Sequence, residues 1–309
     1  MVIQMQLAAF AVNIDKFLKF IRSIRCLSNN TQRAYRADLS LLEKFWREQC
    51  PELPLQAVVQ KFIVNLLYNQ QLATKSIARK FSSLKTFAKF IARKGIELHI
   101  VGKSPKLRVN LPEVLSIEEI ATLGEAITAN PFSAQFAKRD RLIFELLYAT
   151  GMRSFELVNV RLEDIDLESK TIRVWGKGQQ ERIVLFGQRA KQCLEDYLHG
   201  ERKTKKSTKH NFLMINSRRS KLDTRHLRKL FEHFSKLLPL GKKVCPHTLR
   251  HSFATHMLSQ GVDLRVVQEL LGHKRITATQ IYTQISMQAM ADFFSAYHPL
   301  NEIEKPESS

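Results

Sequence analysis

Two segments decide how this chain is interpreted: Pro246-His247-Thr248-Leu249-Arg250-His251 and Gly272-His273-Lys274-Arg275-Ile276-Thr277-Ala278-Thr279-Gln280-Ile281-Tyr282. Both concentrate side chains that handle phosphate groups, and Tyr282 follows His273 by nine residues. A lone tyrosine on a helix is usually a half-buried packing residue. If the two segments converge with Arg153, however, Tyr282 is a candidate nucleophile directed at a phosphate.

The His247-x-x-Arg250 spacing places an imidazole and a guanidinium group on one face of a helix. Pro246 suits the first turn of that helix, where unpaired backbone N–H groups also favour an anion. Taken alone, the pattern is more often a helix end at which the histidine caps or packs. The pattern indicates a phosphate-binding site only when it is combined with the other phosphate-handling residues.

A short helix is expected over residues 262–271, capped by Asp263 and ended by Gly272. This arrangement places His273 at the helix exit. Tyr282 then belongs to the next helix.

Two β-branched and aromatic runs predict a hairpin: Thr171–Trp175 and Arg182–Phe186. Lys177 lies in the connecting turn between two glycines, which permit backbone angles closed to other residues. A lysine in such a turn is normally a solubilising residue. Here its amine is also free to enter a groove.

The 309 residues favour two domains, and their formal charge of +20, from 49 Lys and Arg against 29 Asp and Glu, indicates a polyanionic partner. Hydrophobic residues make up 44% of the chain, which excludes a disordered protein. No signal peptide or membrane-spanning segment is expected. The cysteines are widely spaced and are expected to be ordinary thiols in a reducing cytoplasm: Cys26, Cys50, Cys193 and Cys245.

Helical periodicity dominates the first hundred residues, with Thr31 and Thr74 as expected helix caps. No acidic residue occurs between Glu52 and Glu97, whereas basic residues recur there at helical spacing. Four of them form a candidate DNA-binding stripe: Lys75, Arg79, Lys85 and Lys89. Such a stripe is either a solvated face or a phosphate-binding surface, and the missing acids favour the second.

Periodicity lapses around the basic, proline-containing segment 106–112, which predicts a linker between domains 1–105 and 113–309. The second domain is expected to begin with a helix capped by Ser116 and Glu119, and its helical region to end at Thr150-Gly151. A later basic segment is expected to contact a nucleic-acid backbone through Arg218 and Arg219.

The order of these motifs resembles the tyrosine recombinase family, also called the phage integrase family. The segment 149–157 resembles its first box, Gly176-Lys177-Gly178 its hairpin lysine, and segments 246–258 and 270–285 its second and third boxes. Thr31-x-x-x-Tyr35 and Arg79-x-x-Ser82 in the first domain are similar to Xer-type members. The resemblance implies a mostly α fold with a small antiparallel β-sheet in the C-terminal domain, arranged as a two-domain DNA clamp with a helical, SAM-like core-binding domain.

The resemblance implies catalysis by a defined residue set: Arg153, Lys177, His247, Arg250, His273 and Tyr282. Tyr282 would attack a DNA phosphate to give a 3′-phosphotyrosyl link, which stores the bond energy, so that no cofactor, ATP or metal is needed. His247 is the expected base, with His273 as the alternative, and Lys177 the expected acid for the leaving 5′-oxygen. Glu156 is expected to orient its neighbours.

The implied partners are a double-stranded recombination site and a tetramer on two duplexes, built from this chain alone or with a related recombinase, with a DNA translocase as a further regulator and no membrane. Three aromatic residues either dock on a neighbouring subunit or pack on their own domain: Phe293, Phe294 and Tyr297. Xer-type resolution of chromosome or plasmid dimers is the favoured role. The alternatives are an integrase or resolvase of a mobile element, a type IB topoisomerase, and a DNA-binding regulator without catalysis.

Overall fold

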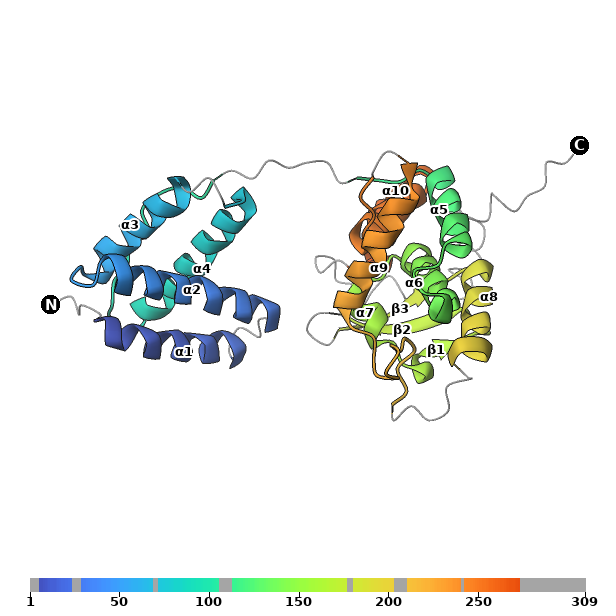
Figure 1. Cartoon of the computed structure of the whole chain (residues 1–309), viewed down its shortest axis with the longest axis horizontal. Coiled ribbons are helices and arrows are strands. Elements are labelled where there is room, and N and C mark those ends of the chain that lie inside the picture. Colours follow the sequence, from blue (N-terminus) through green and yellow to red (C-terminus); the bar gives the residue numbers. More distant parts are fainter. Residues whose placement is uncertain are drawn as a thin grey trace, which may run out of the picture. The chain divides into compact units, whose positions relative to one another are not determined.

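The computed structural model describes residues 6–23, 29–68, 72–105, 113–176, 180–202, 210–239 and 242–272. The chain divides into two compact units, Met1–Asn110 and Leu111–Ser309. Each unit has its own hydrophobic core. The fold class expected from the sequence, mostly α with a small antiparallel sheet in the second unit, is confirmed (Figure 1).

Helices account for the first unit: α1 Leu7–Ser23, α2 Asn29–Gln49, α3 Leu55–Tyr68 and α4 Thr74–Ala92. Aromatic side chains fill the space between α1, α2 and α4, because Phe10 meets both Trp46 and Phe87 edge-on at ring-centroid distances of 5.6 and 5.4 Å. Such edge-to-face pairs add to the stabilisation from burial alone. The rings fix α4 by one face and leave its opposite face exposed.

Two expected helix caps are wrong. Helix α2 begins at Asn29, so Thr31 lies inside its first turn. Helix α4 begins at Thr74 itself, because the carbonyl of Ala73 already accepts hydrogen bonds from the backbone N–H groups of Ser76 and Ile77. Both helices therefore start earlier than a threonine side-chain cap would allow.

The second unit is built from these helices: α5 Ile117–Ala129, α6 Ala137–Thr150, α7 Ser154–Asn159, α8 Gln188–Tyr197, α9 Thr224–Leu237, α10 Pro246–Ser259 and α11 Leu264–Leu270. Helix α6 is central, since every residue from Leu142 to Thr150 is buried and the helix packs against α5, α8 and α10. Short 3₁₀ or π turns lie at 134–136, 162–164 and 198–202.

The sheet is antiparallel, with strand order β1 Ile165–Asp166, β2 Thr171–Trp175 and β3 Glu181–Leu185. The expected hairpin is confirmed, with its second strand starting one residue earlier than predicted. The pair Trp175 and Glu181 closes the end of the ladder nearest to the turn. On β2, Ile172 and Val174 face the core while Arg173 and Trp175 are exposed, as expected of a strand covered on one side.

Several predicted helix boundaries in the second unit are confirmed. Ser116 and Glu119 form a capping box, Asp263 caps α11, and Pro246 occupies the first turn of α10. The helical region ends as expected at Thr150, with Gly151 left-handed at a φ of 58°. The sequence did not reveal the break between α5 and α6 at residues 130–136.

In the described part of the chain, no helix has the length and apolar character needed to cross a membrane.

Candidate active site

Arg153 caps the start of α7, directly after the left-handed turn at Gly151. Its backbone N–H donates to Glu156 Oε2 at 2.7 Å, and its Nη1 donates to Glu156 Oε1 at 2.8 Å. The Arg153 side chain is 43% exposed. One end of the guanidinium group is thus anchored while the remainder faces the surface.

Glu156 is almost fully buried and is held by a second arginine that the sequence analysis did not single out. Arg182 on β3 donates Nη1 to Oε1 at 2.6 Å and Nη2 to Oε2 at 2.9 Å. Burial opposes ionisation of Glu156, but hydrogen bonds and charge from Arg182, followed by the contacts with Arg153, lower the pKa of its carboxyl group. Glu156 is therefore an ionised anchor that orients both arginines, in agreement with its expected role.

Arg250 on α10 is buried and donates to two backbone carbonyls rather than to a carboxylate. Nη1 lies 2.5 Å from the Gly151 oxygen and Nη2 2.5 Å from the Leu271 oxygen. Burial, followed by repulsion from Arg153 and Arg182, lowers the pKa of Arg250 to about 9, so the side chain remains charged at neutral pH.

The structure brings Arg153 and Arg250 together at the end of α11. Arg153 Nη2 approaches the Gly272 carbonyl at 3.5 Å, while Arg250 is bonded to the preceding carbonyl of Leu271. Gly151 permits this approach, because a Cβ atom there would lie 2.7 Å from Phe253 Cδ1 and 2.8 Å from Leu271 Cδ2. Two arginines predicted from motifs about a hundred residues apart therefore occupy one site.

His247 occupies an exposed position in the first turn of α10, three residues before Arg250. Its Nε2 lies 2.9 Å from Nε2 of His251, one turn later, so one ring donates to the other. The ring centroids are 4.2 Å apart at an interplanar angle of 74°. His251 was not among the expected site residues, and its contact sets the orientation of the expected base.

Three of the expected catalytic residues, Lys177, His273 and Tyr282, lie outside the described residues. The residues that flank the undescribed segment 177–179 are Gly176 and Gln180, and the Gly176 N–H donates to the Gln180 carbonyl at 2.8 Å across the turn. A Cβ atom at Gly176 would lie 3.5 Å from Glu156 Oε1. The turn that contains Lys177 thus begins beside Arg153, Arg182 and Arg250, which we call the arginine cluster. The carbonyl of Gly272, which precedes His273, contacts Arg153 of this cluster.

The expected DNA-binding residues of the first unit lie on α4 and are exposed: Lys75, Arg79, Lys85 and Lys89. Arg79 also pairs with the buried carboxylate of Asp38, which Lys80 Nζ meets at 3.1 Å. Arg79 therefore also helps to join α4 to α2. Within the described ranges, Lys75, Lys85 and Lys89 form no ion pair.

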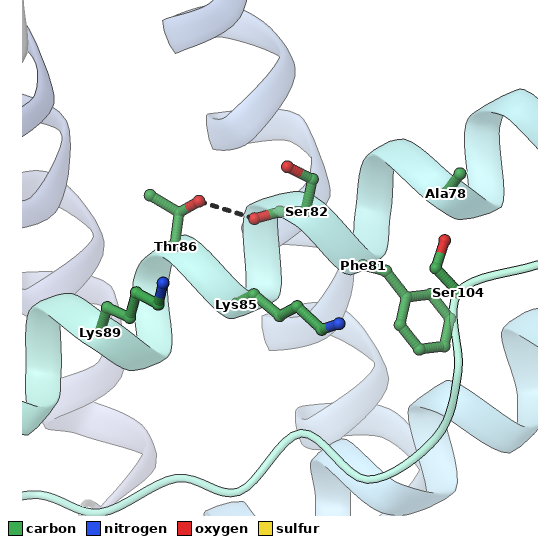
Figure 2. A pocket seen from close by; sticks show the side chains of 7 residues that line it. All are labelled: Ala78, Phe81, Ser82, Lys85, Thr86, Lys89 and Ser104. Atoms are coloured by element: carbon green, nitrogen blue, oxygen red, sulfur yellow. Dashed lines mark hydrogen bonds between the residues drawn. The ribbon is translucent and has the colours of Figure 1, made fainter.

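A surface pocket of about 320 Å³ lies along this face of α4. Figure 2 shows Lys85 and Lys89 beside it, with Ser104 contributed by the chain that follows the helix. Ser82 and Thr86 add hydroxyl groups to the lining, and the Thr86 hydroxyl donates to the Ser82 carbonyl at 2.7 Å. The ammonium groups are suitable donors for phosphate oxygens, whereas the hydrogen of the Thr86 hydroxyl is already used.

Arg218 and Arg219 occupy an exposed turn between two bridged segments. The Asn216 side-chain oxygen accepts the N–H groups of Arg218 and Ser220 at 2.9 and 3.0 Å, and Arg219 has a φ of 58°. The asparagine thus holds a tight turn that projects two cationic residues from the surface.

Comparison with known protein families gives two matches that divide between the two units. The model described as "Phage integrase family" matches residues 113–289. The model described as "Phage integrase, N-terminal SAM-like domain" matches residues 14–95.

The chain is also similar to curated proteins over nearly its whole length. Tyrosine recombinase XerC of Thermodesulfovibrio yellowstonii is 37% identical over 296 residues, covering 94% of this chain and 97% of the relative. Tyrosine recombinase XerD of Halalkalibacterium halodurans is 37% identical over 297 residues, covering 93% and 97%.

Solved structures show the same fold. The XerH site-specific recombinase bound to its difH substrate gives a TM-score of 0.69 at 22% identity and covers 95% of this chain and 97% of that one. A lambda integrase dimer bound to a COC′ core site gives 0.64 at 20% identity, covering 89% and 98%. On the family matches and the full-length similarity to curated relatives, the chain belongs to the phage integrase family and is related to the Xer tyrosine recombinases.

Proposed function

We propose that this protein is a site-specific tyrosine recombinase that cuts and rejoins DNA through a 3′-phosphotyrosyl intermediate on Tyr282. The observation that carries the proposal is the convergence of Arg153 and Arg250 at the end of α11. Two guanidinium groups at one site suit the two non-bridging oxygens of a phosphodiester. The chain that leaves α11 leads directly to His273 and Tyr282.

In the cleavage step, the phenolic oxygen of Tyr282 forms a bond to phosphorus and the bond between phosphorus and the 5′-oxygen breaks. Arg153 and Arg250 stabilise the negative charge that develops on the non-bridging oxygens. The product ester retains the energy of the broken bond, so the 5′-hydroxyl of a second strand reverses the reaction and completes strand exchange.

Two proton transfers accompany cleavage. A phenol has an unperturbed pKa of about 10, so Tyr282 needs a base during attack, and His247 is the proposed one. His273 holds the phosphate or the tyrosine. Lys177 gives a proton to the departing 5′-oxygen, and the first residue of its turn lies beside Glu156.

Sequence-independent contact with the duplex is assigned to the exposed cations of both units: Lys75, Arg79, Lys85, Lys89, Arg218 and Arg219. Their proposed role is to neutralise phosphates and release counterions, which contributes affinity but no base recognition. The pocket beside Lys85 and Lys89 is suited to a backbone phosphate.

The biological role best supported by the similarity to XerC and XerD is resolution of chromosome or plasmid dimers in the cytoplasm. Two duplexes require four strand cleavages, so the active assembly is a tetramer on DNA, formed by this chain alone or with a related recombinase. The domain division proposed with this role is 1–105 and 113–309, joined by residues 106–112.

The test uses nicked suicide duplexes that carry candidate recombination sites and trap the covalent product on a denaturing gel. The unaltered protein is expected to form an adduct, and Tyr282→Phe none. Tyr68→Phe is the matched control, because Tyr68 is 80% exposed on α3, and it should cleave like the unaltered protein. An adduct that persists in Tyr282→Phe would exclude this nucleophile.

DNA binding without any adduct on a cognate site would instead favour a binding regulator. Relaxation of supercoiled DNA without strand exchange would favour a topoisomerase.

A further inference from the structure

Arg182 is a largely buried cation of the candidate active site, and the proposed reaction gives it no task. Its side chain is 12% exposed, and both of its terminal nitrogens bond to Glu156. Its Nε also donates to the Leu270 carbonyl at 3.3 Å, near the end of α11. A single side chain on β3 therefore contacts both α7 and α11.

The hydrogen bonds to Glu156 divide unevenly between the two arginines. Arg182 occupies both carboxylate oxygens with its fork, whereas Arg153 places only Nη1 on the carboxylate, at 2.8 Å. The Arg153 backbone N–H supplies a fourth bond. A carboxylate has about four lone-pair sites, so the acceptor capacity of Glu156 is filled.

This division leaves most of the Arg153 guanidinium group available. Its Nε has no hydrogen bond to a described residue, and its Nη2 has only the 3.5 Å contact to Gly272. If Arg182 vacated the carboxylate, two acceptor sites would open beside Arg153. A bidentate arginine–carboxylate pair is the stronger geometry, so Arg153 would rotate onto Glu156 and turn its donors away from a phosphate.

We propose that Arg182 is a positioning residue for strand cleavage: it saturates Glu156 and so keeps Arg153 directed at the scissile phosphate. The proposal rests on the cleavage function assigned above. Arg182 also fixes the chain that precedes His273, because a Cβ atom at Gly272 would lie 3.0 Å from Arg182 Cδ. The simpler alternative is that Arg182 only neutralises a buried carboxylate and thereby stabilises the fold.

The two explanations predict different cleavage rates for an Arg182 variant on a substrate whose scissile phosphate carries no charge. In a methylphosphonate a methyl group replaces one non-bridging oxygen, so cleavage depends less on a correctly placed arginine. Arg182→Lys keeps the positive charge but loses the fork. On the phosphodiester, it is expected to form adduct about 100-fold more slowly than the unaltered protein, as for a misplaced catalytic group. On the methylphosphonate, the loss should shrink to about tenfold or less.

Arg173→Lys is the matched control. Arg173 lies on the neighbouring strand, its side chain is 48% exposed, and its ion-pair distances to Asp164 and Glu181 are 3.4 and 3.7 Å. It should cleave both substrates at the rate of the unaltered protein. Circular dichroism at the assay temperature checks that each variant is folded.

If Arg182→Lys does not fold, Arg182→Gln replaces it, because it also removes the fork and keeps Glu156, which anchors Arg153. The same large loss on the phosphodiester and small loss on the methylphosphonate are expected, and equal losses on both substrates would overturn the inference.

If Arg182→Lys lowers the rate of adduct formation equally on both substrates, or on neither, Arg182 has only a structural role. The proposed cleavage function would not be affected by that result. Failure of the unaltered protein to form adduct on a cognate phosphodiester would instead reject the cleavage function itself.

Discussion

The arginine cluster of the second unit and the lysine face of α4 in the first unit are both cationic, but they hold their charges differently. Arg250 is buried and the side chain of Arg182 is 12% exposed, and both are fixed by hydrogen bonds to Glu156 or to backbone carbonyls. Lys85 and Lys89 are exposed, without an ion pair to any residue that the structure describes.

This difference matches two demands that DNA makes on a protein. Bond making at phosphorus requires donors fixed to a fraction of an ångström, which only buried and hydrogen-bonded groups achieve. Attraction to the backbone requires positive charge without fixed geometry, for which flexible exposed lysines suffice. Mutations should therefore separate the rate of cleavage from the affinity for DNA.

Among the substitutions that compare these two cationic regions, Arg250→Lys should have the largest effect on cleavage. The donors of a lysine all lie on one nitrogen, which cannot bond to both carbonyls and to a phosphate as a guanidinium fork can, so adduct formation should fall about 10²- to 10³-fold. The rate is measured in single-turnover reactions on suicide duplexes. DNA affinity, measured in parallel, should change by about twofold or less, and a loss of affinity as large as the loss of rate would remove the distinction between the two regions.

Gly151→Ala should destabilise the second unit by about 3 kcal/mol, because the left-handed backbone is strained for alanine and the new methyl group overlaps Phe253 and Leu271. Gly261→Ala is the matched control, since Gly261 also has a positive φ, of 83°, but a Cβ atom there meets no atom within 4 Å. It should cost about 1–2 kcal/mol from backbone strain alone. Urea denaturation measures both, and equal costs would contradict the packing around Gly151.

Glu156→Gln should lower the unfolding free energy by about 2 kcal/mol at pH 7, because the amide leaves the largely buried Arg182 and the partly exposed Arg153 less well compensated. The native pKa of Glu156 is lowered, so its ionised form stabilises the fold above the unfolded pKa of about 4.3. This contribution is lost as the pH falls through the native pKa. The difference between variant and unaltered protein should thus shrink in acid, whereas a difference that stays constant with pH would show that the carboxylate charge is unimportant.

Lys85→Gln should have the smallest effect, a fewfold loss of DNA affinity with an unchanged cleavage rate at saturating DNA. Each phosphate contact contributes about 0.9 to the slope of log affinity against log salt, so replacing Lys75, Lys85 and Lys89 together should reduce that slope by about 2.7. Lys44→Gln is the control, because the 68% exposed side chain of Lys44 pairs with Glu48 on α2. An unchanged slope in the triple variant would exclude this face of α4 from DNA contact.

Local sequence signals predicted much of the second unit. Ser116, Asp263 and Gly151 were identified because a cap or a left-handed turn requires a particular residue type within a few positions. The break after α5 was missed although it contains Asn130-Pro131, a dipeptide typical of turns, because the apolar run of α6 was joined to the helix that begins after Ser116. The starts of α2 and α4 lie upstream of the expected caps, and α4 begins after Ala73, which has no side-chain cap, so residue type alone did not mark that start.

Within the candidate site, the sequence predicted Arg153 and Arg250 as phosphate-binding residues but did not predict how they are held. The carbonyl contacts of Arg250 join positions 99 and 21 residues away, so they depend on the packing of α6, α10 and α11. The sequence also contained a pattern that indicates a buried role for Arg182, but the sequence analysis did not use it. Strand alternation places it on the same face as Val184, which is buried, so an inward arginine there requires a carboxylate partner.

The net charge of the arginine cluster can be compared with the charge of the phosphate before and during cleavage. Its three guanidinium groups, those of Arg153, Arg182 and Arg250, face one carboxylate, so two positive charges have no carboxylate counterpart within the cluster. A phosphodiester in its ground state brings one negative charge, whereas the five-coordinate phosphorus formed by an attacking oxyanion bears two. The cluster therefore matches the transition state better than the bound substrate, which is the condition for lowering a barrier rather than only tightening binding.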